Sequence, residues 1–141
     1  MDRRFGTQIV AVWQFACAPS GGNCMELQVQ CRLMTRMIPA TFPGTSDSGA
    51  ERRVFEALES ADGPYTVLYD IAWLGRGEHE GTQGQCDFLV LHPSRGVLVI
   101  EVKGGTLSRD TGGQWQSSGK KDNFTIEDPF AQANRSKFAL R

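Results

Sequence analysis

Residues Gly84–Gly105 read GQCDFLVLHPSRGVLVIEVKGG, and this stretch decides the fold. It contains two largely apolar runs, 86–91 and 96–103, which we expect to be strands. The residues between them include Pro93, and Gly96 follows, a composition that suits a tight connection. The stretch therefore predicts a β-hairpin. Its second strand is apolar almost without alternation, as expected of a strand covered on both faces.

Three charged residues mark the open end of this hairpin. Asp87 begins the first strand, and Glu101 lies near the end of the second. The antiparallel return brings these two acids side by side, on strands about 4.8 Å apart. Lys103 follows Glu101 by two residues, so both side chains lie on the same face of the strand.

Such a set of charges suits metal-dependent phosphodiester hydrolysis. Carboxylate oxygens are the ligands that Mg²⁺ takes in proteins, and a bound cation lowers the pKa of an attacking water. A neighbouring lysine can orient that water or offset charge on the phosphate in the transition state. The alternative is an ordinary ion pair between Glu101 and Lys103 at the end of a strand, worth under about 1 kcal/mol.

The residues before the hairpin predict a helix and a strand. Ser48 with Glu51 three residues later is a capping-box pattern, and apolar residues then recur at helical spacing. We expect a helix over about 49–60, ended by the Asp-Gly-Pro at 62–64. Residues 65–74 are rich in β-branched and aromatic side chains and predict a strand, followed by a charged, glycine-rich loop.

After the hairpin, a weaker strand is expected at an edge over 114–117, with an indole at Trp115 that packs the sheet. A final helix begins at Asp128, which suits an N-cap because Pro129 follows in the first turn. The helical period is still running when the sequence reaches Arg141, so we expect a truncated domain.

The first part of the chain differs from the rest in its sequence pattern. Residues 1–36 carry no sustained period of 2 or 3.6, so we interpret them as an atypical leader, either disordered or a mis-assigned translation start; a secretory signal is the alternative. Residues 37–48 are an extended lead-in, and 49–141 form the domain. The four cysteines lack the spacing of a zinc site and are expected to be reduced thiols.

The composition is that of an ordinary globular protein, with 141 residues, 40% of them hydrophobic and 22% charged. The formal net charge of -1 shows no overall basicity, but an acidic metal site is compatible with a phosphate substrate. No apolar run approaches the roughly 18 residues of a membrane span, and no G-x-x-x-x-G-K-[ST] nucleotide-binding loop is present.

The segment Gly84–Gly105, followed by Trp115 and by DPFAQANRSKFAL (128–140), closely resembles the nuclease-related domain (NERD) family of the PD-(D/E)XK restriction-endonuclease-like superfamily. The similarity covers about residues 37–141. MIPATFP (37–43) resembles the variety found N-terminal to bacterial helicase-like proteins. The resemblance implies an α/β (α+β) fold with an αβββαβ core, a mixed sheet flanked by helices, of which the chain holds roughly the first five elements.

The resemblance also implies a site. Asp87 and Glu101 match the metal-binding acids, Lys103 matches the catalytic lysine, and Glu51 matches an acid on the first helix that can reach the metal. Gln132 matches a glutamine expected near the active site. Glu51 has an alternative interpretation as a helix-start carboxylate favoured by the helix dipole, and Gln132 as a surface glutamine.

The expected function is Mg²⁺-dependent (or Mn²⁺-dependent) hydrolysis of DNA phosphodiester bonds, in processing or repair. The expected partners are DNA and a covalently linked or associated helicase or ATPase, and the expected location is the cytoplasm, away from membranes. The alternatives are a non-catalytic nucleic-acid-binding or docking module of the same fold and a truncated fragment with no independent activity.

Overall fold

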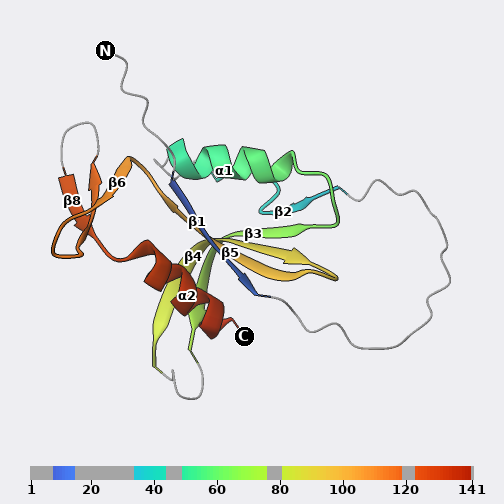
Figure 1. The fold of residues 1–141 in the computed structure, drawn as a ribbon. Coiled ribbons are helices and arrows are strands. Elements are labelled where there is room, and N and C mark those ends of the chain that lie inside the picture. Colours follow the sequence, from blue (N-terminus) through green and yellow to red (C-terminus); the bar gives the residue numbers. More distant parts are fainter. Residues whose placement is uncertain (1–7, 15–33, 44–48, 76–80, 119–122, 141) are drawn as a thin grey trace, which may run out of the picture.

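The structure is a computed structural model that describes residues 8–14, 34–43, 49–75, 81–118 and 123–140. These residues form two β-sheets and two helices (Figure 1). In chain order the elements are β1 (Gln8–Gln14), β2 (Arg36–Ile38), α1 (Gly49–Glu59), β3 (Thr66–Leu74), β4 (Gln83–His92), β5 (Gly96–Lys103), β6 (Thr106–Arg109), β7 (Trp115–Ser118), β8 (Asn123–Ile126) and α2 (Pro129–Ala139).

The larger sheet has five strands in the order β1-β5-β4-β3-β2. Strands β3, β4 and β5 form an antiparallel meander, and β2 is parallel to β3, so the sheet is mixed. The expected β4–β5 hairpin is confirmed, with His92 paired to Gly96 at its turn. The ring of His92 stabilises that turn, because its Nδ1 accepts hydrogen bonds from the backbone amides of Ser94 and Arg95 at 3.2 and 3.1 Å.

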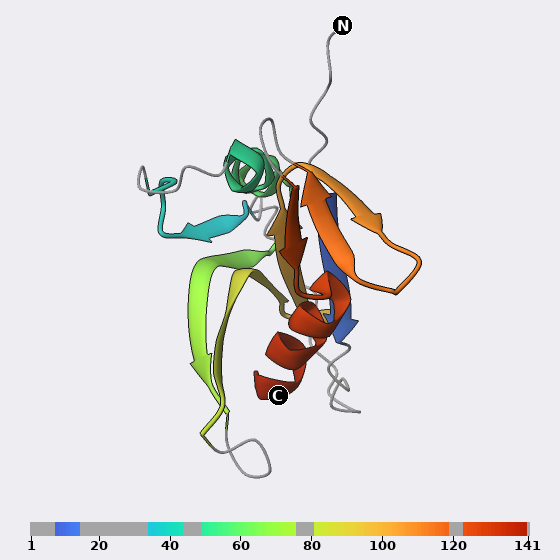
Figure 2. The same ribbon diagram turned by 90° about the vertical axis from the view of Figure 1, so that its left-hand side faces the viewer.

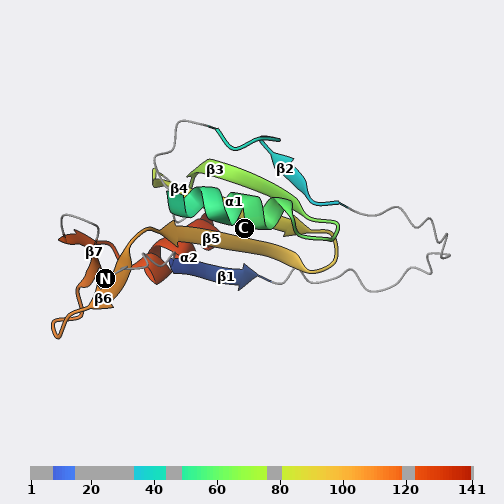
Figure 3. The same cartoon turned by 90° about the horizontal axis from the view of Figure 1, so that it is seen from above.

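The two helices cover opposite faces of this sheet (Figures 2 and 3). On one face, Phe55 of α1 packs with Phe88 and other buried residues of the meander. On the other, Leu140 at the end of α2 packs against Leu89 and Val99. Alternate residues of β5 therefore enter different cores, which explains why the strand is apolar almost without alternation.

Helix α2 begins where the sequence predicts. The Asp128 carboxylate accepts hydrogen bonds from the amides of Phe130 and Ala131, and Pro129 occupies the first turn. The helix is tied to the β3–β4 hairpin by its Ser136 hydroxyl, which accepts a 3.0 Å hydrogen bond from the Trp73 indole. α1 also agrees with its predicted span, although Ser48 of the expected capping box lies outside the described residues.

A second sheet of three strands, in the order β6-β7-β8, connects β5 to α2 (Figure 1). The expectation of an edge strand over 114–117 is wrong in one respect, because β7 is the middle strand of this sheet. The reason is that residues 123–126 form a third strand, β8, on its other side. The Trp115 ring packs at 5.8 Å, centroid to centroid, from that of Phe130.

Strand β1 is the main departure from the sequence-based expectation. Residues 8–14 lie in the segment interpreted as a leader without regular structure, yet they pair antiparallel with β5 over seven positions. Without β1, the backbone groups along this edge of β5 have no strand partner, and pairing satisfies them. The lead-in also contributes to the fold, because Met37 of β2 is buried in the core beneath α1.

The expected mixed α/β fold is thus confirmed, while the last strand of the αβββαβ core stays a prediction. Neither helix in the described part of the chain has the length and apolar character that crossing a membrane requires. Cys86 is a buried free thiol, as expected, and the other three cysteines lie outside the described residues.

Candidate active site

The site lies where regular pairing within the β3–β4–β5 meander breaks down. The β4–β5 ladder ends with Phe88 opposite Ile100. Asp87 and Glu101 at the next positions do not pair with each other, although Glu101 pairs with Val10 of β1 on its other side. Instead, the Val102 amide donates a 2.6 Å hydrogen bond to Oδ2 of Asp87. One carboxylate therefore replaces a backbone acceptor at the point where the two strands separate.

The neighbouring strand has an irregularity at the same level. Tyr69 and Ile71 of β3 pair with Phe88 and Cys86 of β4, but Asp70 between them pairs with nothing in the ladder. Asp70 has a φ of 59°, which is uncommon for a residue with a side chain. This backbone turn lies opposite Asp87, so the hairpin bends at the level of the candidate site.

Glu101 and Lys103 form the ion pair that their spacing predicts. Lys103 Nζ lies 2.6 Å from Glu101 Oε1. The Glu101 side chain is almost wholly buried, whereas Lys103 remains partly accessible. The second oxygen of Glu101, Oε2, is buried and has no hydrogen-bond partner among the residues that the structure describes. A buried carboxylate oxygen without a partner costs free energy, so its retention suggests a ligand that the side chain serves.

Burial raises the pKa of both acids. Desolvation, opposed by the Lys103 hydrogen bond and reinforced by the charge of Asp87, raises the pKa of Glu101 to about 7. Desolvation also raises the pKa of Asp87, although the Val102 amide acts in the opposite direction. The charge of Asp87 disfavours the ionisation of Glu101, and a nearby cation would relieve that repulsion.

Glu51 approaches the site from the first turn of α1. Its Oε2 accepts a 2.6 Å hydrogen bond from the hydroxyl of Tyr69 on β3. The charge of Glu51 acts on both Asp87 and Glu101, raising the pKa of each in addition to the effect of burial. The structure therefore brings Glu51 into the electrostatic environment of the two strand acids, although as a helix residue it is also close to the positive end of the helix dipole.

Gln132 is not joined to these acids. It is half-buried on α2, and within the part of the chain that the structure describes its amide makes no hydrogen bond to a carboxylate of the site. Its backbone N–H donates a hydrogen bond to the backbone carbonyl of Asp128, as expected in the first turn of a helix. Its role in the site stays a prediction.

Three residues that affect the candidate site, Tyr69, Asp70 and Cys86, were absent from the sequence-based prediction of the site. Tyr69 holds Glu51, and the charge of Asp70 contributes to the raised pKa of Asp87. Burial, with the charges of Glu101 and Asp87, raises the pKa of Cys86 to about 12, so this thiol stays protonated. A signal for Asp70 did exist, because a charged residue in the middle of the apolar run TVLYDIAWL is unusual.

The donor chemistry suits a hard divalent cation only in part. Asp87 and Glu101 offer carboxylate oxygens from neighbouring strands, including the buried Oε2 without a partner. One or two carboxylates plus water and substrate oxygens are the usual protein ligands of Mg²⁺. Among the described residues, however, no three His, Cys, Asp or Glu side chains are gathered closely enough to hold an ion.

One comparison with known proteins identifies a family for the chain. A family model described as the nuclease-related domain (NERD) matches residues 46–141, more than half of the chain. The matched region includes the helix α1, the β3–β4–β5 meander and all five candidate site residues. No curated protein and no solved structure gave a match.

Proposed function

The chain belongs to the nuclease-related domain family, and on that premise we propose that it hydrolyses DNA phosphodiester bonds with Mg²⁺ (or Mn²⁺) as cofactor. One observation carries the proposal: the buried Glu101 and the half-buried Asp87 lie with Lys103 at the point where two strands separate, and the charge of Asp87 adds to the raised pKa of Glu101. An arrangement with such a cost to stability is typical of a functional site.

Asp87 and Glu101 would hold the metal, with Glu51 as a third acid. When bound, the cation supplies charge to the phosphate oxygens and lowers the pKa of a coordinated water. Lys103 is held beside Glu101 by its 2.6 Å contact and remains partly accessible, so its ammonium can offset charge on the phosphate. Tyr69 is a positioning residue, because its hydroxyl fixes the carboxylate of Glu51.

The wider context is part of the same proposal. We infer a role in DNA processing or repair in the cytoplasm, in partnership with a linked or associated helicase or ATPase. The motor would have to be supplied by that partner, because this sequence contains no G-x-x-x-x-G-K-[ST] motif.

A second candidate is a non-catalytic nucleic-acid-binding or docking module. One observation favours it: among the described residues, no three potential metal ligands come together. This candidate predicts binding to DNA that weakens with salt and needs no divalent metal. It gives no reason for the buried Glu101 to lie with the half-buried Asp87 and the partly accessible Lys103.

A cleavage assay separates the two candidates. The full chain is incubated with labelled DNA in Mg²⁺ or in EDTA, alongside Asp87→Asn, Lys103→Gln and the matched control Asp62→Asn, which changes an exposed acid. We expect metal-dependent cleavage that falls by about 10²–10³-fold in the two site variants, the usual effect of losing one electrostatic contact to a transition state.

The control variant should cleave like the unmodified chain. Cleavage that is equal in all four proteins would exclude this site as the catalytic centre. Metal-independent binding without any cleavage would favour the docking module instead.

A further inference from the structure

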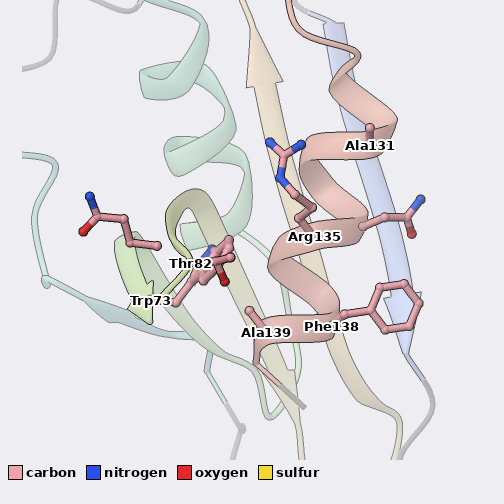
Figure 4. A pocket seen from close by; sticks show the side chains of 8 residues that line it. Trp73, Thr82, Ala131, Arg135, Phe138 and Ala139 are labelled. Atoms are coloured by element: carbon pink, nitrogen blue, oxygen red, sulfur yellow. The ribbon is translucent and has the colours of Figure 1, made fainter. Parts of the chain in front are cut away.

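A pocket separates the end of the β3–β4 hairpin from α2 and is called the α2 pocket below (Figure 4). Its volume is about 560 Å³, within the range of small-molecule sites. The hairpin contributes Trp73 and Gln83, and the helix contributes residues at i, i+3, i+4 and i+7 of one face, Ala131, Asn134, Arg135 and Phe138. The walls are mainly apolar, with two amides and one guanidinium.

The indole of Trp73 is held in place. Its Nε1 donates to Ser136 Oγ at 3.0 Å, which fixes the ring plane relative to α2. Its other side lies against Gly84, where a side-chain Cβ would come within 2.3 Å of the indole Cζ2. The glycine therefore makes room for the ring. Phe138 lines the outer edge of the pocket, with its ring projecting from α2 away from Trp73 (Figure 4); it is 51% exposed, and the Lys137 ammonium lies 4.5 Å from its ring centroid. The pocket thus has one buried, fixed aromatic wall and one accessible aromatic ring.

Arg135 connects this pocket with the candidate active site. Its side chain extends toward the N-terminal end of α2 (Figure 4) and forms an ion pair with Glu127. The hydrogen bond with Glu127 and, to a smaller extent, the charge of Glu101 raise the pKa of Arg135. The guanidinium therefore lies within electrostatic reach of the candidate active site. Both partners of the ion pair are about half exposed, and such pairs contribute little to stability. Exchange of Glu127 for another anion would therefore cost the fold little.

We propose that the α2 pocket takes an unstacked nucleobase of a single nucleic acid strand, while Arg135 holds the adjoining phosphate. The inference rests on the proposed function and names its substrate class. Aromatic rings bind bases by stacking, and a guanidinium matches two phosphate oxygens at once. The amides of Gln83 and Asn134 offer both donors and acceptors to a base edge. A base in a duplex has both faces stacked and cannot enter, so single strands and frayed ends are the preferred ligands.

The test measures equilibrium binding in EDTA by fluorescence anisotropy. The full chain is titrated into a labelled thymidine oligonucleotide and, separately, into a duplex of the same length. Phe138→Ala should weaken binding to the single strand about tenfold, the effect of losing one base–aromatic stack, and leave duplex binding unchanged. Phe124→Ala is the matched control, because Phe124 on β8 is 59% exposed and lies outside the pocket. It should change neither affinity.

Arg135→Gln tests the phosphate contact. It should weaken single-strand binding and reduce the slope of log affinity against log salt by about one. Arg95→Gln at the β4–β5 turn is its control and should leave the slope unchanged. Thermal melting of each variant verifies that the fold is intact.

The proposal is overturned if Phe138→Ala binds the single strand like the unmodified chain, or if it weakens single-strand and duplex binding equally. If Arg135→Gln leaves the slope of log affinity against log salt unchanged, Arg135 does not contact a phosphate. Because no metal is present, these results are independent of cleavage: a chain without nuclease activity can still pass this test, and an active nuclease can fail it.

Discussion

The two ends of the β4–β5 hairpin differ although they belong to the same two strands. From the turn to Phe88 and Ile100, residues pair in regular register, and most are apolar. Beyond that pair the ladder stops, a side-chain carboxylate accepts the next backbone amide, and two acids and a lysine take the place of apolar residues. We call these the closed end and the open end.

The difference shows how a small domain can retain an unfavourable cluster of charges. The closed end contributes buried apolar surface to the cores on both faces of the sheet. The open end loses the pairing between β4 and β5 and buries the carboxylate of Glu101, both of which oppose folding. Because β4 and β5 run continuously through both ends, the stable closed end holds the charged residues of the open end in position. Mutations at the closed end should therefore affect stability, and mutations at the open end should affect function or even increase stability.

The largest stability effect is expected at the closed end. Phe88 is fully buried and contacts the ring of Tyr69 at 5.1 Å, centroid to centroid. Phe88→Ala should lower the free energy of unfolding by about 3–5 kcal/mol, the usual range for removing a buried phenylalanine. Urea unfolding of the full chain measures this loss, and Phe124→Ala at an exposed site should cost far less. Equal losses of stability in the two variants would contradict the prediction that burial of Phe88 at the closed end stabilises the fold.

Glu101→Gln at the open end is expected to increase the free energy of unfolding. The pKa of Glu101 is raised by burial to about 7 from an ordinary value of 4.5. Below pH 4.5 the group is protonated in both folded and unfolded chains and costs nothing; as pH rises through 7 its ionisation favours the unfolded chain. Removing the charge should therefore stabilise the metal-free protein at pH 8 by about 2 kcal/mol, after allowing for the lost Lys103 hydrogen bond.

The pH dependence provides the check on this interpretation. The gain from Glu101→Gln should be present at pH 8 and shrink toward zero near pH 4.5. Denaturation curves at both pH values, with EDTA present, measure it. A gain that is the same at both pH values would mean that packing, rather than ionisation, is responsible.

A smaller effect is expected for Tyr69→Phe, which keeps the buried ring and removes only the hydroxyl that contacts Glu51. It should cost about 1–2 kcal/mol, because the hydroxyl donates to a charged group. If Glu51 binds the metal as proposed, loss of the residue that orients it should also weaken Mg²⁺ binding by about tenfold. Tyr65→Phe, near the turn end of the hairpin, is the control, and its Mg²⁺ affinity should not change. Equal Mg²⁺ affinities in all three proteins would exclude the positioning role of Tyr69.

The smallest effect is expected for Glu127→Gln, which removes the ion pair with Arg135. Both side chains are about half exposed, so the loss should be under about 1 kcal/mol. Thermal melting at low and high salt measures it, and the small difference from the unmodified chain should shrink further as salt screens the pair. A large loss would show that this pair holds α2 in place.

The sequence was sufficient for features with a local physical cause. A turn composition at Pro93 and Gly96 predicted the hairpin, and a two-residue spacing predicted that Glu101 and Lys103 face the same way. The cap at Asp128 predicted the start of α2. Each of these depends on neighbours only a few residues apart, so the pattern itself contains the information.

Features that depend on tertiary contacts could not be predicted. The pairing of residues 8–14 with β5 joins segments about ninety positions apart, and nothing in the local pattern specifies that register. The hydrogen bond from Tyr69 to Glu51 requires the packing of α1 on β3. The positive φ of Asp70, and hence the bend at the site, also follows from the surrounding sheet rather than from the residue type.

Isothermal titration of Mg²⁺ into the metal-free full chain tests the central claim, that the open end of the hairpin is a metal site. The measurement is repeated with Asp87→Asn and with Asp62→Asn, which changes an exposed acid away from the hairpin's open end. We expect saturable binding by the unmodified chain and by Asp62→Asn, and loss of that binding in Asp87→Asn. Identical titration curves for the three proteins would contradict the account.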